Sequence, residues 1–304
     1  MPRRGDRPAV RGAGALGSSR LLRLNDGRAL AWAQWGDREG TPVIDLHGNP
    51  GCRLLTWGGE PVVERAGVHL LSFDRAGIGR SDPAGERSVA EAASDPLELA
   101  DSLGIERFGV LGYSLGGAYA AALTAVAPDR VGSVALVSSV VPLGELGSLS
   151  ELGHAGQWRL AWRAPRLLAL LYRVVAGLAM RRPALAARLT AAGLSAPDRA
   201  ILSRPEVRAR LGPVAVETGR NGGRGTVEDM RAAIRPWGVS LSQVAAPTIV
   251  WQGTDDVAIP AAWGERLAAA IPDAELRLLP GEGHCLIEDR LSDILTALSG
   301  PLRE

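Results

Sequence analysis

Ser114 is the residue around which a chemical reaction is most readily organised in this sequence. It is the centre of the pentapeptide GYSLG at residues 112–116, which lies between an apolar run at residues 108–111 and an alanine-rich helical pattern. A strand that turns at once into a helix holds the residue at the turn in a strained conformation, and flanking glycines let the backbones pass closely. The spacing therefore predicts a nucleophile elbow, with the serine hydroxyl exposed above the end of a strand.

A serine hydroxyl needs an adjacent base to act as a nucleophile at neutral pH, and one histidine is suitably placed. His284 ends the turn PGEGH, which follows a predicted strand at residues 274–279. The other three histidines lie in a turn, inside a strand and in an inserted segment: His47, His69 and His154. We therefore predict that His284 is the general base and then the general acid.

Two neighbouring aspartates, Asp255 and Asp256, follow the predicted strand at residues 247–251. Successive side chains of an extended chain point in opposite directions, so the two carboxylates cannot both reach the histidine. Asp256 lies three residues after Gly253 and four before Pro260. We choose Asp256 as the group that orients the imidazole and supports its charged form.

Two backbone N–H groups are predicted to stabilise the oxyanion of an acyl-transfer intermediate. Leu115 follows the serine at the start of a helix, where N–H groups have no intrahelical partner. The turn HGNPG at residues 47–51 is dense in glycine and proline, and such turns bring backbone N–H groups close to whatever lies above them. We assign the backbone N–H groups of Asn49 and Leu115 to an oxyanion hole.

The elements that must position these groups alternate between strands and helices. A hairpin around the turn at residues 25–27 begins the sheet. Apolar runs then predict strands at residues 43–46, 68–73, 108–111, 134–137, 247–251 and 274–279, and helical patterns lie between most of them, including one at residues 89–103. This alternation implies a mostly parallel sheet covered on both faces. Ligands of such sheets bind beyond the carboxyl ends of the strands, where the loops named above all lie.

From residue 142 to residue 240 the strand pattern stops and Leu, Ala and Arg predominate. We predict that this segment is a helical cap over the elbow, inserted into a core formed by residues 21–141 and 241–304. Residues 151–210 contain eleven Arg and three acidic residues. Three interpretations are open: solvated faces of amphipathic helices, a lid that attracts an anionic or aromatic substrate, and peripheral contact with a membrane.

Two smaller groups of residues also have alternative interpretations. Glu217, Arg220 and Asp229 lie late in the insertion, where they either fix the return of the cap by ion pairs or line the pocket. Cys52 and Cys285 each lie beside a catalytic loop. They serve either as small buried apolar residues or as a redox-sensitive pair.

Composition excludes several classes of protein. A net charge of +1 creates no global field that favours nucleic acid, and two cysteines provide neither a disulfide framework nor a cysteine metal site. We expect no cofactor and no metal. Residues 1–20 are predicted to be a disordered leader without the apolar core of a signal peptide. The longest apolar run, residues 167–180, is interrupted by Arg173 and too short to span a bilayer. A cytoplasmic protein with a small-molecule substrate fits best, and composition carries no information on oligomeric state.

With these motifs identified, the sequence resembles the α/β-hydrolase superfamily from about residue 21 to residue 299. The resemblance rests on the chain order Ser, Asp, His and on five motifs, HGNPG at 47–51, DRAGIGRSD at 74–82, GYSLG at 112–116, GTDDVAIP at 253–260 and GEGH at 281–284. It implies an α/β fold with a mostly parallel eight-stranded sheet, helices on both faces and a helical cap after the sixth strand. It also implies Asn49 and Leu115 as oxyanion donors. The first motif is similar to that of the proline iminopeptidase branch, which usually has glycine where this chain has Asn49.

Within this superfamily the nucleophile restricts the reaction. Haloalkane dehalogenases and epoxide hydrolases have Asp at the position of Ser114, some lactone hydrolases have Cys, and hydroxynitrile lyases use a lysine, which this chain lacks. We therefore predict a serine hydrolase that cleaves a small-molecule ester, lactone or thioester through an acyl-enzyme on Ser114. The alternative is non-hydrolytic use of the fold, as a cyclase in secondary metabolism or as a small-molecule receptor. A third option is an iminopeptidase-like enzyme or a hydrolase of amide or carbon–carbon bonds.

Overall fold

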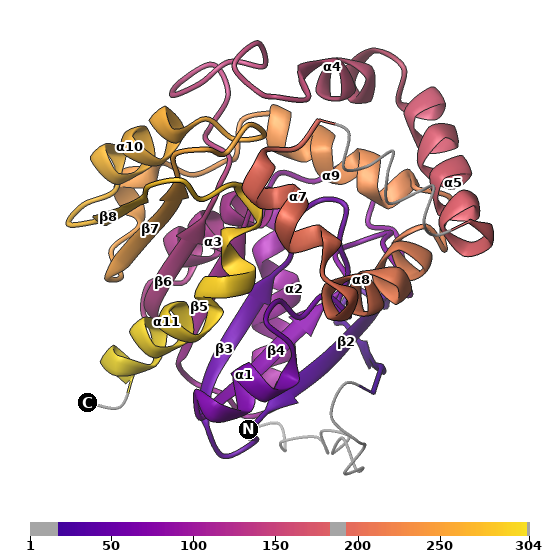
Figure 1. Cartoon of the computed structure of the whole chain (residues 1–304). Helices are drawn as coiled ribbons and strands as arrows, with labels where there is room; N and C mark the ends of the chain where they lie inside the picture. The colour runs from indigo at the N-terminus through magenta and orange to yellow at the C-terminus, as the bar shows by residue number, and fades with distance from the viewer. Residues whose placement is uncertain (1–17, 183–192, 303–304) are drawn as a thin grey trace.

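The computed structural model describes residues 18–182 and 193–302, which are built around one β-sheet (Figure 1). The strands follow one another across the sheet in the order β1 (Arg20–Arg23), β2 (Ala29–Gly36), β4 (Val68–Phe73), β3 (Thr41–Leu46), β5 (Phe108–Tyr113), β6 (Val131–Val137), β7 (Thr248–Gly253) and β8 (Glu275–Leu279). β2 is antiparallel to β1 and to β4, and all pairs from β4 to β8 are parallel. The eight-stranded, mostly parallel sheet predicted from the sequence is confirmed in the described part of the chain.

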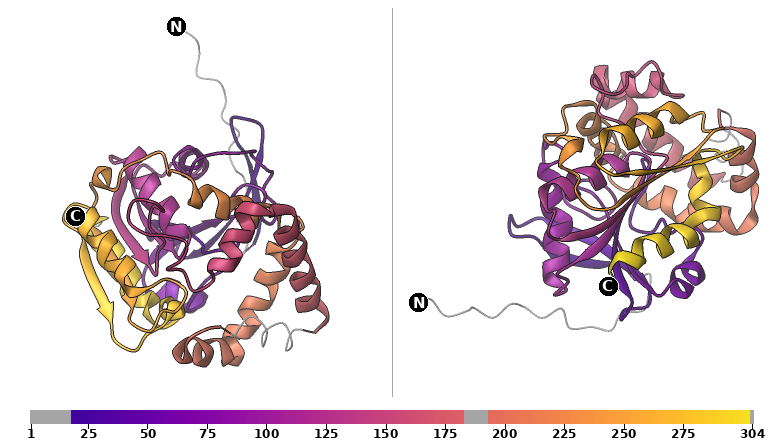
Figure 2. Two further views of the ribbon diagram at one scale, coloured as in Figure 1. Left: turned by 90° about the horizontal axis from the view of Figure 1, so that it is seen from above. Right: turned by 90° about the vertical axis from the view of Figure 1, so that its left-hand side faces the viewer.

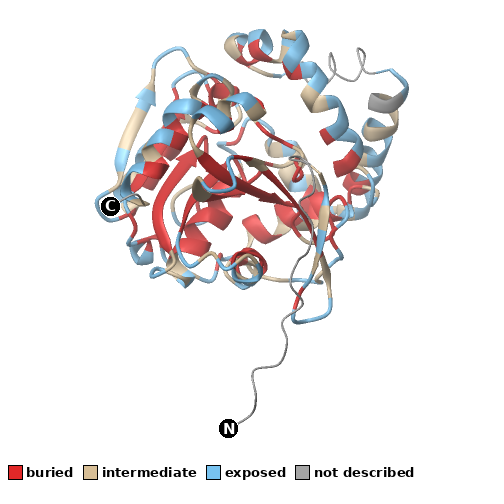
Figure 3. Cartoon of the chain, turned by 90° about the horizontal axis from the view of Figure 1, so that it is seen from below, coloured by how far each residue is buried: buried red, intermediate tan, exposed pale blue. Residues whose placement is uncertain are grey.

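Helices cover both faces of the sheet, which explains the unbroken apolar runs of its central strands. Every residue of β4, β5 and β6 is buried, and Figure 3 shows these strands as a continuous buried centre. Successive residues of β3 point to opposite faces. Val43 packs with Val63 and Leu291, whereas Ile44 belongs to a separate cluster with Ala121.

The two layers of helices follow from this alternation. One face is covered by α1 (Glu60–Arg65) and α11 (Ile287–Ser299), and the other by α2 (Ser94–Ser102), α3 (Gly116–Val126) and α10 (Ala261–Ala270). In α3 nine residues are buried, and four of these are alanine. Small side chains let this helix approach the sheet closely, which matters because Ser114 lies just before its first residue.

The helix predicted for residues 89–103 begins later than expected. A 3-10 turn at Glu91–Ala93 leads into α2, whose first residue is Ser94. A helix that began at residue 89 would place Pro96 in its interior, where the ring removes a hydrogen bond and clashes with the preceding turn. With the observed start, Pro96 lies in the first turn, where no backbone donor is needed. At the other end Gly104 adopts a φ of 70°, as expected for a glycine that follows a helix.

Between β6 and β7 the described chain contains helices and no strand. They are α4 (Ala155–Arg163), α5 (Pro165–Arg181), α7 (Ala196–Ser203), α8 (Pro205–Thr218) and α9 (Arg224–Ile234). Proline occupies one of the first two positions of α5, α7 and α8, where its missing N–H costs no helical hydrogen bond. This group of helices lies along one end of the sheet, with α5 at its outer edge (Figures 1 and 2).

The predicted leader is described only at its end, because residues 1–17 lie outside the described residues. β1 begins at Arg20, inside the range predicted as leader. The hydroxyl of Ser19 accepts hydrogen bonds from Nε and Nη2 of Arg53, at 2.9 and 2.6 Å. The first described strand therefore begins one residue before the predicted start of the core. None of the helices in the described ranges has the length and apolar character needed to cross a bilayer.

Candidate active site

Ser114 occupies a sharp turn between β5 and α3. Its φ of 55° is in the left-handed region that few non-glycine residues adopt. A Cβ atom at Gly116 would lie 1.8 Å from the carbonyl oxygen of Leu46, and one at Gly112 would lie 2.5 Å from the Cβ of Ala120. Both positions therefore require glycine because neighbouring segments pass too closely for a side chain, as the spacing of the pentapeptide predicted.

The structure brings Ser114, His284 and Asp256 together in one chain of hydrogen bonds. The Nε2 atom of His284 lies 3.1 Å from the Oγ of Ser114, and its Nδ1 atom lies 2.8 Å from Oδ2 of Asp256. A carboxylate can only accept a hydrogen bond, so Nδ1 carries the proton. Nε2 is then left as the acceptor for the serine hydroxyl, which is the arrangement a general base needs.

Asp256 and Asp255 have different surroundings. The carboxylate of Asp256 is buried, and its Oδ1 accepts hydrogen bonds from the backbone N–H groups of Ala258 and Ile259 at 2.9 and 2.8 Å. Asp255 is exposed, and its carboxylate accepts a hydrogen bond from the hydroxyl of its neighbour Thr254. The turn after β7 thus holds Asp256 toward His284 and leaves Asp255 on the surface.

The surroundings of His284 favour a charged imidazole. Burial alone disfavours the imidazolium, but the Asp256 carboxylate outweighs it, so the pKa of His284 is raised above its ordinary value. The ring packs against Tyr113 with centroids 5.2 Å apart, and Tyr113 in turn meets Trp57 edge to face at 5.3 Å. These aromatic rings hold the imidazole in place while leaving it able to accept a proton.

Two backbone N–H groups beside Ser114 have no hydrogen-bond partner among residues 18–182 and 193–302. They are the N–H of Leu115, which precedes α3, and the N–H of Asn49 in the turn after β3. Leu115 is buried and Asn49 is partly buried. Most backbone N–H groups of a folded protein have a partner, and the role of these two as donors to a negatively charged oxygen stays a prediction.

The turn at residues 47–51 is held from two sides by Arg75 and Asp229. The guanidinium of Arg75 donates to the carbonyl oxygen of His47 at 2.6 Å and binds both carboxylate oxygens of Asp229 at 2.8 and 2.6 Å. Asp229, from α9, also accepts a hydrogen bond from the side-chain amide of Asn49 at 3.0 Å. Burial opposes the ionised form of Asp229, but Arg75 outweighs it and lowers the pKa of this carboxyl group. A helix of the insertion therefore positions the predicted oxyanion turn.

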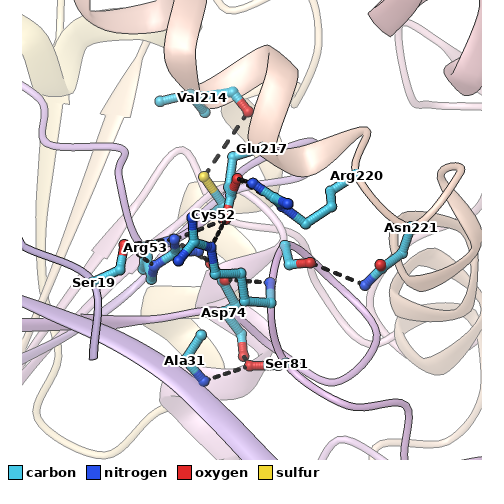
Figure 4. Close-up of polar contacts among 12 residues, drawn as sticks. Ser19, Ala31, Cys52, Arg53, Asp74, Ser81, Val214, Glu217, Arg220 and Asn221 are labelled. Carbon is cyan, nitrogen blue, oxygen red and sulfur yellow. Dashed lines mark hydrogen bonds and ion pairs between the residues drawn. The ribbon is translucent and has the colours of Figure 1, made fainter. Parts of the chain in front are cut away.

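A second ion-pair cluster joins α8 to the core and is drawn in Figure 4. Arg53 is buried between Asp74, with which it forms a close ion pair, and Glu217, whose carboxylate lies 2.7 Å from its Nη2. Arg220 pairs with the same Glu217 at 2.9 Å. Ion pairs to the core are thus made by Glu217 and Asp229, as one interpretation of the sequence proposed, whereas Arg220 pairs within the insertion.

Asp229 also borders a cleft in the described part of the chain. Asp229 lines a cleft together with Arg75, Tyr119 and Arg87, although neither Ser114 nor His284 belongs to its lining. Asp229 therefore serves as an ion-pair partner and also borders a cleft that is separate from the chain of hydrogen bonds at Ser114.

The remaining histidines and cysteines are separate from this chain of hydrogen bonds. His47 is buried, and burial followed by the Arg75 charge lowers its pKa to about 3, so it is neutral. Its Nδ1 atom bonds to the carbonyl oxygen of Gly48 at 2.8 Å. Cys52 and Cys285 are free and buried in different apolar clusters, which favours their interpretation as small buried residues.

Asp198 is a site residue that sequence reasoning missed. It lies in the first turn of α7 and is fully buried. Its Oδ1 accepts the backbone N–H of Cys285 at 2.7 Å, and its Oδ2 accepts the hydroxyl of Ser195 at 2.7 Å. A Cβ atom at Gly283 would lie 2.5 Å from Oδ1, so the glycine permits this contact. Asp198 of the insertion thus contacts the residues immediately before and after His284, Gly283 and Cys285.

No sequence signal identified this contact because 87 residues separate Asp198 from Cys285. The pattern Ser195, Pro197, Asp198 is an ordinary start of a helix, with a capping serine and an acidic residue in the first turn. Such a pattern predicts α7 but not what it packs against. Within the described ranges, no three His, Cys, Asp or Glu side chains are grouped so as to hold a metal ion.

Comparison with known proteins identifies the family to which these motifs and this fold belong. A family model described as the alpha/beta hydrolase fold matches residues 41–291. A 2-hydroxy-6-oxononadienedioate/2-hydroxy-6-oxononatrienedioate hydrolase of Cupriavidus pinatubonensis is 30% identical over 282 residues, which cover 88% of this chain and 89% of the relative. A proline iminopeptidase of Neisseria gonorrhoeae is 27% identical, covering 91% and 93%. Among solved structures, an enol-lactonase of Burkholderia xenovorans LB400 superposes with a TM-score of 0.66 at 22% identity, covering 94% and 100%.

Proposed function

Because this chain belongs to the α/β-hydrolase fold family, we propose that it is a serine hydrolase that cleaves a small-molecule ester, lactone or thioester. The observation that carries this proposal is the chain of hydrogen bonds from Ser114 through His284 to Asp256, at 3.1 and 2.8 Å. A non-catalytic receptor has no need of a hydroxyl hydrogen-bonded to a base that is itself oriented by a buried carboxylate. The arrangement favours the enzyme over the receptor for that reason.

In the proposed acylation step, the Ser114 oxygen attacks the acyl carbon while Nε2 of His284 takes its proton. The charge that develops on the acyl oxygen is stabilised by the N–H groups of Leu115 and Asn49, each worth about 3 kcal/mol in the transition state. His284 then gives the proton to the leaving group. Asp256 stays ionised throughout and stabilises the imidazolium.

Deacylation repeats these steps with water as the nucleophile. His284 removes a proton from the water as its oxygen attacks the acyl-enzyme, and the same two N–H groups hold the oxyanion. His284 then returns the proton to the Ser114 oxygen as the bond between this oxygen and the acyl carbon breaks. The carboxylic acid product is released and the Ser114 hydroxyl is restored. No residue beyond those named is required for this sequence of transfers. We place the activity in the cytoplasm because both cysteines are free and buried, as a reducing compartment allows.

Hydrolysis of a carbon–carbon bond next to a ketone is a second candidate. It is favoured by the ring-cleavage-product hydrolase of Cupriavidus pinatubonensis, with which this chain aligns over most of its length. An iminopeptidase is less well supported, because recognition of a free amine calls for an unpaired carboxylate near the site. Asp198 and Asp229, the buried acidic residues contributed there by α7 and α9, are both already hydrogen-bonded.

A panel of substrates tests this ranking of the three candidate reactions. We expect turnover of p-nitrophenyl esters, simple lactones and acyl thioesters, with a dependence on acyl size that reports the shape of the pocket. The same panel contains a 2-hydroxy-6-oxo dienoic acid and an N-terminal proline amide, and each substrate is repeated with Ser114→Ala. Turnover confined to the dienoic acid would establish the second candidate, and turnover confined to the proline amide would contradict the proposal.

A positioning role for Asp198 is predicted to appear in the pH profile. Burial disfavours the His284 imidazolium, whereas Asp256 and, less strongly, Asp198 favour it and raise its pKa. Asp198→Asn keeps an oxygen to accept the Cys285 N–H but removes the charge. The pKa of His284 then falls, so the acidic limb of kcat/KM moves to lower pH. We expect kcat to fall about tenfold, because the imidazolium formed in the transition state loses support.

The matched control is Asp293→Asn, an exposed carboxylate on α11, which we expect to leave the profile unchanged. Both variants are measured for kcat/KM against pH and for thermal unfolding. A lowered melting temperature with an unchanged acidic limb would assign Asp198 to folding alone.

A further inference from the structure

The outward face of α5 presents a row of large apolar side chains to solvent. We call Leu167, Leu170, Leu171, Val174 and Val175 the α5 stripe. Their side chains are exposed to 49, 52, 45, 59 and 41%, respectively. Their spacing of three and four residues places them on one side of the helix. The opposite side carries Leu168 and Ala169, which are buried in the main core cluster.

The α5 stripe is therefore a second apolar face, in addition to the one that packs on the rest of the protein. Isolated apolar residues on a surface need no explanation, but a continuous row marks a contact site. Trp162, near the end of α4, is a further large apolar side chain that is 49% exposed. Figures 1 and 2 show α5 at the outer edge of the molecule, away from the sheet.

The charged side chains of α4 and α5 have one sign. Arg159, Arg163, Arg166 and Arg173 are exposed on α4 and α5, and none forms an ion pair with another described residue. In the sequence, no acidic residue occurs between Glu151 and Asp198. An apolar face bordered by unpaired arginines, with an exposed tryptophan, has the chemistry of a helix that lies in the interface of an anionic bilayer.

A second copy of this chain fits the α5 stripe poorly. A symmetric contact would place the same face on both sides, so arginines of one copy would approach arginines of the other with no carboxylate from this segment between them. An anionic lipid surface instead provides apolar chains for the α5 stripe and phosphate groups for the guanidinium groups at once.

We propose that α4 and α5 form a surface that docks on anionic phospholipid membranes, with the α5 stripe inserted among the upper acyl chains. The helix lies along the surface and does not cross it, because α5 has 17 residues and carries three arginines. This proposal does not depend on the hydrolase activity, since none of these residues belongs to the candidate active site.

The test is co-sedimentation of the full chain with large unilamellar vesicles. One set is made of phosphatidylcholine alone and the other of phosphatidylcholine mixed with phosphatidylglycerol. We expect binding to the anionic vesicles at low salt, weaker binding at high salt because screening shortens the reach of the arginines, and little binding to neutral vesicles. Light scattering of the free protein is recorded in the same buffers.

Two double variants separate the apolar and the charged contributions. Leu170→Ser with Val174→Ser removes the centre of the α5 stripe, and Arg166→Gln with Arg173→Gln removes two charges while keeping side-chain length. Each is expected to weaken partitioning about tenfold or more. The matched control is Leu21→Ser with Val126→Ser, which replaces two exposed apolar residues on the core and is expected to bind like the parent.

All four proteins are compared for far-ultraviolet circular dichroism and thermal unfolding, which exposed substitutions should leave unchanged. Parent protein that stays in the supernatant with anionic vesicles would overturn the proposal. Equal sedimentation of the parent and the α5 stripe variant would overturn it too. A parent dimer that Leu170→Ser with Val174→Ser converts to monomer would assign this face to a second copy instead.

Discussion

Ser114→Ala is expected to abolish turnover of every hydrolysed substrate while leaving the protein folded. Without the hydroxyl there is no nucleophile for His284 to activate, and kcat should fall on the order of 10⁶-fold. The Oγ of Ser114 makes one side-chain hydrogen bond in the described structure, to His284. Its loss should change the free energy of unfolding by at most about 1 kcal/mol.

The measurement is the intact mass of the protein after exposure to a fluorophosphonate, together with the rate of p-nitrophenyl acetate hydrolysis. The parent should gain one adduct, and Ser114→Ala should gain none. Ser138→Ala is the matched control, because Ser138 is also a buried serine at the end of a strand with a positive φ, of 46°. Ester hydrolysis at the parent rate in Ser114→Ala would refute the mechanism. Absence of an adduct in the folded parent would favour the cyclase or receptor.

Asp256→Asn is expected to lower kcat about 10⁴-fold with little change in structure. An amide in place of the carboxylate can present an N–H group to Nδ1 of His284, which lies 2.8 Å from the oxygen it replaces. The imidazole then carries its proton on Nε2, facing Ser114, and cannot accept the serine proton. The imidazolium of the transition state also loses its counter-charge.

Asp255→Asn is the matched control for this prediction, because Asp255 is adjacent in sequence, exposed and hydrogen-bonded to Thr254. We expect its kcat/KM to remain within a few-fold of the parent. Both variants are assayed with the same ester over a range of pH. A larger loss in Asp255→Asn than in Asp256→Asn would reassign the acidic residue, whatever distance separates Asp256 from His284 in the structure.

Local patterns were sufficient to predict much of this fold. Buried strands appear as apolar runs because both faces of the sheet are covered, and β4, β5 and β6 were recognised in this way. The glycines around Ser114 were informative because a close approach of backbones excludes every other residue. The start of α2 was predicted too early, since the apolar pattern extends beyond the point at which Pro96 allows a helix to begin.

The contacts between the insertion and the core were not predictable in the same way. Asp198 looks in sequence like an ordinary acidic residue of an amphipathic helix, and for Asp229 an ion pair was one of two interpretations, without a named partner in the core. Their partners, Cys285 and Arg75, are 87 and 154 residues away. The outward direction of the α5 stripe was equally hidden, because a helix that is apolar on two sides does not reveal which side packs on its own protein.

By itself, the sequence determined the alternation of strands and helices and the five loop motifs. It also determined the choice of Ser114, His284 and Asp256 as the groups to examine, because spacing along the chain governs these features directly. Only the tertiary structure decided that α7 holds the loop around His284, that α9 holds the turn around Asn49, and that α5 turns apolar side chains outward. Those arrangements depend on how separate elements pack, and hydrophobic burial is non-directional, so a sequence pattern specifies that a face is apolar but not what it meets.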